Sequence, residues 1–151
     1  MTQDATEGTT EIRIERLLSA GVEEVYTAWT SPASMARWLS PTGQAEVEAD
    51  VRVGGRLRVV MVGEGRRIEH TGEYLTVEPP HRLVFTWRSS YTGERPSEVT
   101  VALSDEGGAT RLVLAHRRLP EATAAAHEGG WGAILDRLAD DIDERSTSHG
   151  R

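Results

Sequence analysis

The fold is decided by residues 127–142, whose sequence is HEGGWGAILDRLADDI. The large apolar side chains of this segment recur with the spacing of one helix face: Trp131, Ile134, Leu135, Leu138 and Ile142. Asp136, Arg137, Asp140 and Asp141 fall on the opposite face. We therefore expect a long helix, preceded by Pro120, that lays its apolar stripe on a sheet. Gly129 and Gly130 lower helix propensity, so they predict a kink or a later helix start.

The sequence before this helix has the pattern of β-strands. Apolar and polar residues alternate with period two, as in Ile12 and Ile14, which is the pattern of half-buried strands. Seven such segments are expected, at residues 11–18, 45–50, 56–61, 67–78, 83–87, 99–103 and 112–116. Short turns join the later ones as hairpins, so we expect an antiparallel sheet. Arg56 and Arg58 fall on its solvated outer face.

Two short helices are expected between the first and second strands. Val22, Val25, Tyr26 and Trp29 follow helical spacing, and Ser31 can cap a second helix that carries Met35 and Trp38. The sequence thus predicts an α+β helix-grip fold, with a curved seven-stranded antiparallel sheet and the long helix over its concave face. We expect one domain over residues 11–143, with flexible termini at 1–10 and 145–151.

A cavity follows from the dimensions of these elements. A helix is about 10–12 Å across with its side chains, which is narrower than the face of a curved seven-stranded sheet. Bulky side chains must fill the remaining space, but the chain has only eight aromatic residues. We therefore expect a pocket between sheet and helix.

Several segments in this order resemble a known family. They are Val25 to Thr30, Ala36-Arg37-Trp38, Gly54-Gly55, the block from Gly72 through Glu78-Pro79-Pro80 to Trp87, Ser97 to Val101, Thr110-Arg111-Leu112, and His127 to Trp131. Over residues 11–143 the chain resembles the START-like, or SRPBCC, helix-grip superfamily. Within it, the chain is similar to homologues of the C-terminal domain of the activator of the ninety-kilodalton heat-shock protein ATPase.

The resemblance implies a fold that binds apolar or amphipathic small molecules between sheet and helix. Relatives include lipid carriers, polyketide cyclases and aromatases, hormone receptors, and actinobacterial proteins of antibiotic self-resistance. One departure is Trp38-Leu39-Ser40-Pro41, where the family often has a second Trp after the first. The separate N-terminal domain of the eukaryotic co-chaperone has no room in 151 residues, which weighs against a chaperone-activating role.

Composition excludes several kinds of chemistry. All 17 basic residues are Arg, and the chain has neither Lys nor Cys. Schiff-base lysines, Walker-type phosphate loops, disulfides and thiolate metal sites are thereby excluded. A net charge of −7 argues against nucleic-acid binding. With no long apolar run and no signal peptide we expect a cytoplasmic protein, and we expect no cofactor and no metal.

Three histidines are the candidate polar groups of the pocket. His116 is in phase with Leu112 and Leu114, and His127 lies four residues before Trp131, so the two can meet at one end. A bulge at Gly72 turns His70 inward and Tyr74 outward; without it, His70 and Tyr74 share a face. Both arrangements stay open. The other expected ligand-contacting residues are Trp38, Met61, Phe85, Trp87, Leu112, Leu114 and Trp131.

Three functions are consistent with these residues. The first is a binding protein, a monomer or homodimer, that holds a hydrophobic small molecule, with self-resistance to a natural product by sequestration or sacrificial reaction as its sharpest form. The second is a polyketide cyclase, aromatase or hydratase that uses His70, His116 or His127 as acid or base. The third is a chaperone-interaction domain. No nucleophile or catalytic motif is recognisable in the sequence.

Overall fold

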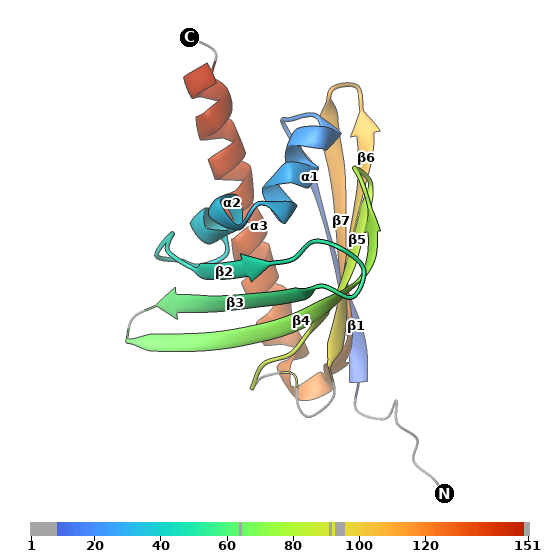
Figure 1. Ribbon diagram of the computed structural model, residues 1–151, viewed down its shortest axis with the longest axis vertical. Helices are drawn as coiled ribbons and strands as arrows, with labels where there is room; N and C mark the ends of the chain where they lie inside the picture. Colours follow the sequence, from blue (N-terminus) through green and yellow to red (C-terminus); the bar gives the residue numbers. More distant parts are fainter. Residues whose placement is uncertain (1–8, 64, 91, 93–95, 150–151) are drawn as a thin grey trace, which may run out of the picture.

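A computed structural model describes residues 9–63, 65–90, 92 and 96–149. Its strands form one antiparallel sheet in the order β1-β7-β6-β5-β4-β3-β2 (Figure 1). The strands are β1 (Thr9–Leu18), β2 (Glu46–Ala49), β3 (Arg56–Gly63), β4 (Arg66–Glu78), β5 (Arg82–Trp87), β6 (Ser97–Glu106) and β7 (Ala109–Pro120). The predicted seven-stranded antiparallel sheet is confirmed.

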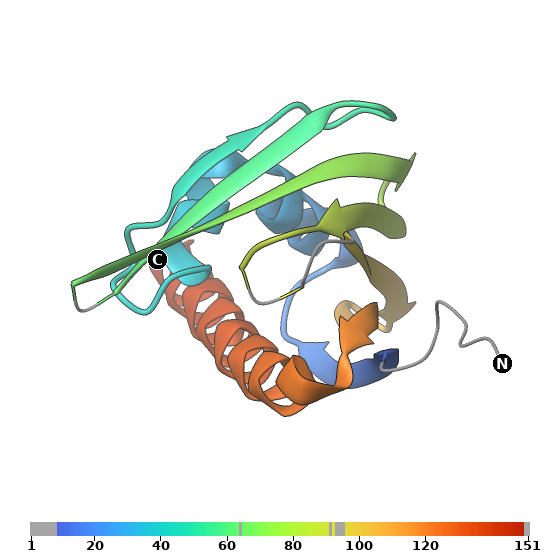
Figure 2. The same ribbon diagram turned by 90° about the horizontal axis from the view of Figure 1, so that it is seen from below.

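Three helices occupy the inner side of this sheet: α1 (Val22–Thr30), α2 (Pro32–Trp38) and α3 (Glu121–His149). The sheet curves around α1 and α2, and α3 lies along its open side (Figure 2). As predicted, Ser31 caps α2, since its hydroxyl oxygen accepts a bond from the Ser34 amide. None of the helices in the described part of the chain is long and apolar enough to cross a membrane.

The long helix begins directly after Pro120, as predicted, but it extends further than expected at its C-terminal end. It runs unbroken from Glu121 through Gly129 and Gly130, so the later start suggested by the glycines was wrong. It also continues to His149, past the predicted domain end at residue 143. The other residues expected to be flexible, 1–8 and 150–151, lie outside the described residues.

The polar face of α3 docks on its neighbours. Arg137 donates from Nε to the Trp38 carbonyl at 3.1 Å, and Arg37 pairs with Asp141 at 3.0 Å. Both bonds join α3 to α2, and the first satisfies a carbonyl at the end of that short helix. A face that periodicity assigns to solvent therefore fixes the position of α3.

The irregular part of the sheet is the middle of β4, where the sequence left two arrangements open. The β3–β4 register is continuous through Gly72, and the bulge lies between Tyr74 and Thr76. His70 and Tyr74 are consequently both buried, whereas the bulged Leu75 is 40% exposed. A bulge at Gly72, with Tyr74 turned outward, was therefore wrong.

Gly72 is required for another reason. A Cβ at this position would lie 1.9 Å from the Thr86 carbonyl oxygen, so only glycine allows β4 and β5 to come this close. The Thr86 hydroxyl in turn accepts a bond from the Glu73 amide at 2.9 Å. Because the register of β4 with β3 is uninterrupted here, strand parity places His70 on the same side of the sheet as α3.

Candidate functional site

A pocket of about 320 Å³ lies between β3, β4, β5 and α3. Its buried walls are His70, Trp87, Trp131 and Ile134, with His127 half-buried. The remaining lining residues, Met61, Ile68, Ala126 and Gly130, are half-buried or exposed and form the rim. No charged side chain belongs to this lining among the described residues. The predicted pocket between sheet and helix therefore exists, and it is apolar apart from two imidazoles and the indole nitrogens.

Aromatic rings form most of the buried wall. The His70 ring stacks on Trp87 with centroids 4.5 Å apart and planes inclined by 24°. Trp87 also contacts Trp131 at 5.5 Å, which joins the sheet side of the pocket to the helix side. Further inside, Phe85 packs edge-on against Trp87 at 5.9 Å. The pocket is thus lined by flat faces that suit a flat apolar ligand.

His116 sits behind this wall and has both ring nitrogens occupied. Trp131 Nε1–H donates to its Nδ1 at 2.9 Å, and its Nε2 lies 2.6 Å from Ser97 Oγ. The Ser97 hydroxyl hydrogen is used on the Trp87 carbonyl, also at 2.6 Å. Nε2 must therefore carry the hydrogen and donate to Ser97, which defines one neutral tautomer. Burial lowers the pKa of His116 to about 3, and the nearby His127 and His70 act in the same direction.

His127 lies on α3 between His116 and the pocket. Its ring meets the His116 ring edge-on, with centroids 5.2 Å apart, so the predicted meeting of the two histidines is correct. Its Nδ1 lies 2.9 Å from the Thr123 carbonyl oxygen, one turn earlier on the helix. Because a carbonyl oxygen can only accept, Nδ1 is the protonated nitrogen of His127.

His70 faces the pocket from β4 and is 6% exposed. Burial lowers its pKa to about 4, and the neighbouring His127 contributes in the same direction. Its Nδ1 is buried and finds no hydrogen-bond partner among the described residues. A buried nitrogen without a partner beside an apolar pocket makes His70 a candidate ligand-contacting residue.

The structure divides the predicted ligand-contacting residues into three groups. Met61, His70, Trp87, His127 and Trp131 come together around the pocket. Phe85, with Trp87 and Trp131, borders a separate gap of about 10 Å³ deeper in the core. Trp38, Leu112, Leu114 and His116 are completely buried and belong to neither lining.

Sequence reasoning missed four lining residues, Ile68, Ala126, Gly130 and Ile134, as site residues. Ile134 follows Trp131 by three positions on the apolar stripe and could have been found from helical spacing. Ile68 shares strand parity with His70. The signal for Gly130 is of a different kind. A glycine in the interior of a helix lacks a side chain, so it can mark the place where the helix borders a pocket.

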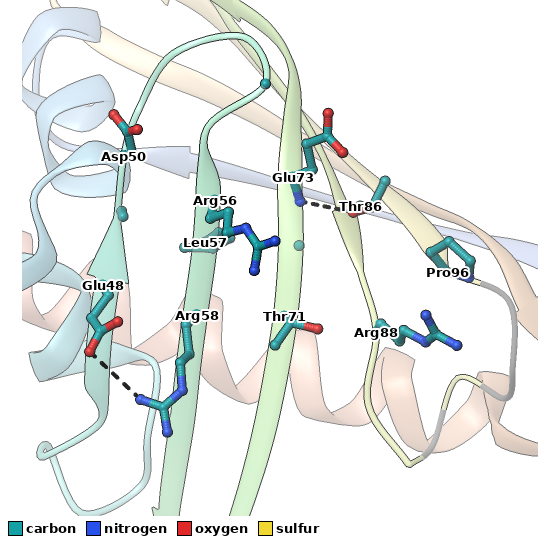
Figure 3. A pocket seen from close by; sticks show the side chains of 13 residues that line it. Glu48, Asp50, Arg56, Leu57, Arg58, Thr71, Glu73, Thr86, Arg88 and Pro96 are labelled. Atoms are coloured by element: carbon teal, nitrogen blue, oxygen red, sulfur yellow. Dashed lines mark hydrogen bonds and ion pairs between the residues drawn. The ribbon is translucent and has the colours of Figure 1, made fainter.

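A larger hollow, of about 810 Å³, lies on the outer face of the sheet (Figure 3). Arg56, Arg58, Thr71 and Arg88 stand along it, on the side of the sheet away from α3. Its charges are exposed and partly paired: Arg58 lies 2.6 Å from Glu69 and 3.8 Å from Glu48. Solvated ion pairs offer a ligand little apolar surface on which to leave water, so the smaller, uncharged pocket is the better candidate.

Within the described residues no group of three or more histidine and carboxylate side chains is arranged to hold a metal ion.

Comparison with known proteins gives one family and many similar structures. The family model described as activator of Hsp90 ATPase homolog 1-like protein matches residues 19–142. CalU16 from Micromonospora echinospora is 33% identical with a TM-score of 0.70, over 87% of this chain and 73% of that one. CV1439 from Chromobacterium violaceum is 30% identical with a TM-score of 0.76, over 87% and 96%. Mll3558 from Rhizobium loti is 26% identical with a TM-score of 0.75, over 89% and 97%. A search of curated proteins found no match.

Proposed function

The chain belongs to the family of activator of Hsp90 ATPase homolog 1-like proteins, and we propose that it binds a hydrophobic or amphipathic small molecule in the pocket between the sheet and α3. The family resemblance predicted from the sequence is confirmed. The family has a ligand-binding fold, and this chain has an apolar pocket between the sheet and the long helix of that fold.

One observation carries the proposal: an uncharged pocket of about 320 Å³ is walled by the rings of His70, Trp87 and Trp131. Pockets that bind small molecules occupy about 300–1,000 Å³ and are mostly apolar, with few polar groups that orient the ligand. The present pocket matches that description at the small end of the range. Its polar groups, the two imidazoles, are of the kind that orients a ligand rather than attracts it from a distance.

For the biological role, we propose self-resistance to a natural product, either by sequestration or by sacrificial reaction. Support comes from the superfamily resemblance and from the pocket. A catalytic role is second, and the position of His70 and His127 in the pocket lining favours it over an inert carrier. Interaction with a heat-shock ATPase stays a prediction, to be tested by co-purification and stimulation of ATP hydrolysis.

The pocket is tested with a neutral fluorescent probe, N-phenyl-1-naphthylamine, whose emission rises in apolar surroundings. Saturable binding at one probe per chain is expected. Gly130→Leu should weaken it by at least about tenfold, because this position lines the pocket and the new side chain fills it.

Gly129→Leu is the matched control. Gly129 is the neighbouring helix residue, it does not line the pocket, and in the described structure no atom lies within 4 Å of a Cβ at either glycine. Equal affinity in both variants would contradict the proposed site. Recovery of a bound natural product unchanged favours sequestration, whereas steady conversion that His127→Phe abolishes favours an enzyme.

A further inference from the structure

The hydrogen bonds of His127 determine which hydrogen-bonding group of a ligand fits this pocket. Its Nδ1–H is used on the Thr123 carbonyl at 2.9 Å. A neutral imidazole has a single N–H, so Nε2 of His127 is a bare acceptor. No donor reaches that atom from the described residues, and it is not among the buried polar atoms. Among the described residues no group satisfies Nε2, so it is free to accept from a ligand.

The other hydrogen-bonding groups of the wall are arranged differently. Trp131 Nε1–H is directed at His116, away from any ligand. His70 lines the pocket from the opposite side, β4, with its ring flat against Trp87. The ligand thus meets the Nε2 acceptor of His127 on the helix side, and stacked rings with the unpartnered Nδ1 of His70 on the sheet side.

Charge is the third constraint. The described lining has no Arg, Asp or Glu, so a charged ligand group would lose its hydration without gaining a counter-ion. A neutral ligand avoids that loss.

We propose that the ligand is a neutral, flat aromatic molecule with a hydroxyl group, and that this hydroxyl donates to Nε2 of His127. The inference rests on the proposed function, since it concerns the same pocket. The volume of about 320 Å³ suits about two or three fused rings. His127 is then a specificity-determining residue, while Trp87 and Trp131 supply most of the contact surface.

The test compares four naphthalenes that share one ring system: 2-naphthol, 2-methoxynaphthalene, naphthalene and 2-naphthoate. Binding is measured by titration calorimetry at pH 8. We expect 2-naphthol to bind about threefold to tenfold more tightly than its methyl ether, the worth of one neutral hydrogen bond. The naphthoate anion should bind most weakly of the four.

His127→Phe should bring 2-naphthol down to the affinity of the ether, so that the ratio of the two affinities falls to about one. His127→Gln, which keeps a side-chain acceptor, should recover part of the preference, and it serves if the Phe variant does not fold. A hydroxyl preference that survives in His127→Phe, or tighter binding of naphthoate than of 2-naphthol, would overturn the inference. Equal binding of all four compounds would overturn it but leave the proposed function standing. No binding of any compound would remove both.

Discussion

The indole N–H of Trp131 donates a 2.9 Å hydrogen bond to Nδ1 of His116, so the helix that closes the pocket is bonded to the strand behind it. Nε2 of His116 donates to the Ser97 hydroxyl oxygen, and the Ser97 hydroxyl donates to the Trp87 carbonyl. The two tryptophans of the pocket wall are therefore linked through one buried polar chain. These hydrogen bonds make His116 a structural residue, although its position in the sequence is also typical of an acid or base.

Replacing His116 should cost more stability than replacing its neighbour His127. His116→Phe leaves the buried Trp131 N–H without an acceptor, and an unsatisfied buried donor costs about 1–3 kcal/mol. His127→Phe removes a single bond of a half-buried ring, with an expected loss below about 1 kcal/mol. Urea denaturation of the two variants measures both losses. Equal losses would show that the His116 bonds do not contribute as described.

Stability should fall as the solution is acidified below pH 6.5. The folded-state pKa values of His70 and His116 are depressed, to about 4 and about 3, because both rings are buried. Between pH 6.5 and those values the unfolded chain binds protons that the folded chain does not, so the free energy of unfolding decreases with falling pH. Each ring should contribute about 1.6 kcal/mol of loss between pH 6.5 and pH 5, because the unfolded-state histidine is already half protonated at pH 6.5.

The variant His70→Phe measures how much of this pH dependence of stability comes from His70. The variant keeps a ring against Trp87 but cannot titrate, so its loss of stability between pH 6.5 and pH 5 should be about half that of the parent protein. Chemical denaturation at a series of pH values provides the comparison. Superimposable pH curves for parent and variant would mean that His70 is not held neutral by burial.

Gly72 and Gly63 should respond oppositely to alanine. Gly72→Ala places a Cβ 1.9 Å from the Thr86 carbonyl, and separating β4 from β5 should cost about 3 kcal/mol or more. Gly63 ends β3, and in the described structure no atom lies within 4 Å of a Cβ there, so Gly63→Ala should be neutral or slightly stabilising. Thermal denaturation of the pair checks this, and a harmless Gly72→Ala would contradict the β4–β5 geometry.

The sequence predicted the elements well because both periodicities are strong. Alternation located the strands, and the stripe from Trp131 to Ile142 located the helix that covers them. The orientation of His70 could not be settled, because the only visible signal for a bulge was Gly72. The actual bulge at Leu75 involves no glycine, and Gly72 serves a close contact with Thr86 that only the folded sheet reveals.

The site was partly predictable for the same reason. Strand parity and helical spacing bring Met61, Trp87 and Trp131 together, but neither shows where the core is filled and where it is open. Leu112 and Leu114 have the correct parity yet lie where the core is filled. Ser97 shares parity with Val99 and could have been found by extending that strand, whereas its bond to His116 on β7 depends on the register between strands.

The most direct test of a ligand pocket between sheet and α3 is a two-dimensional ¹H–¹⁵N NMR titration that follows the four tryptophan indole N–H signals. With 2-naphthol added, the signals of Trp87 and Trp131 should move and saturate at one ligand per chain, because both rings line the pocket. The signal of Trp38, which is buried away from the pocket, should stay in place. Saturable shifts confined to the arginine-lined outer face of β3, β4 and β5, with Trp87 and Trp131 unmoved, would contradict the account.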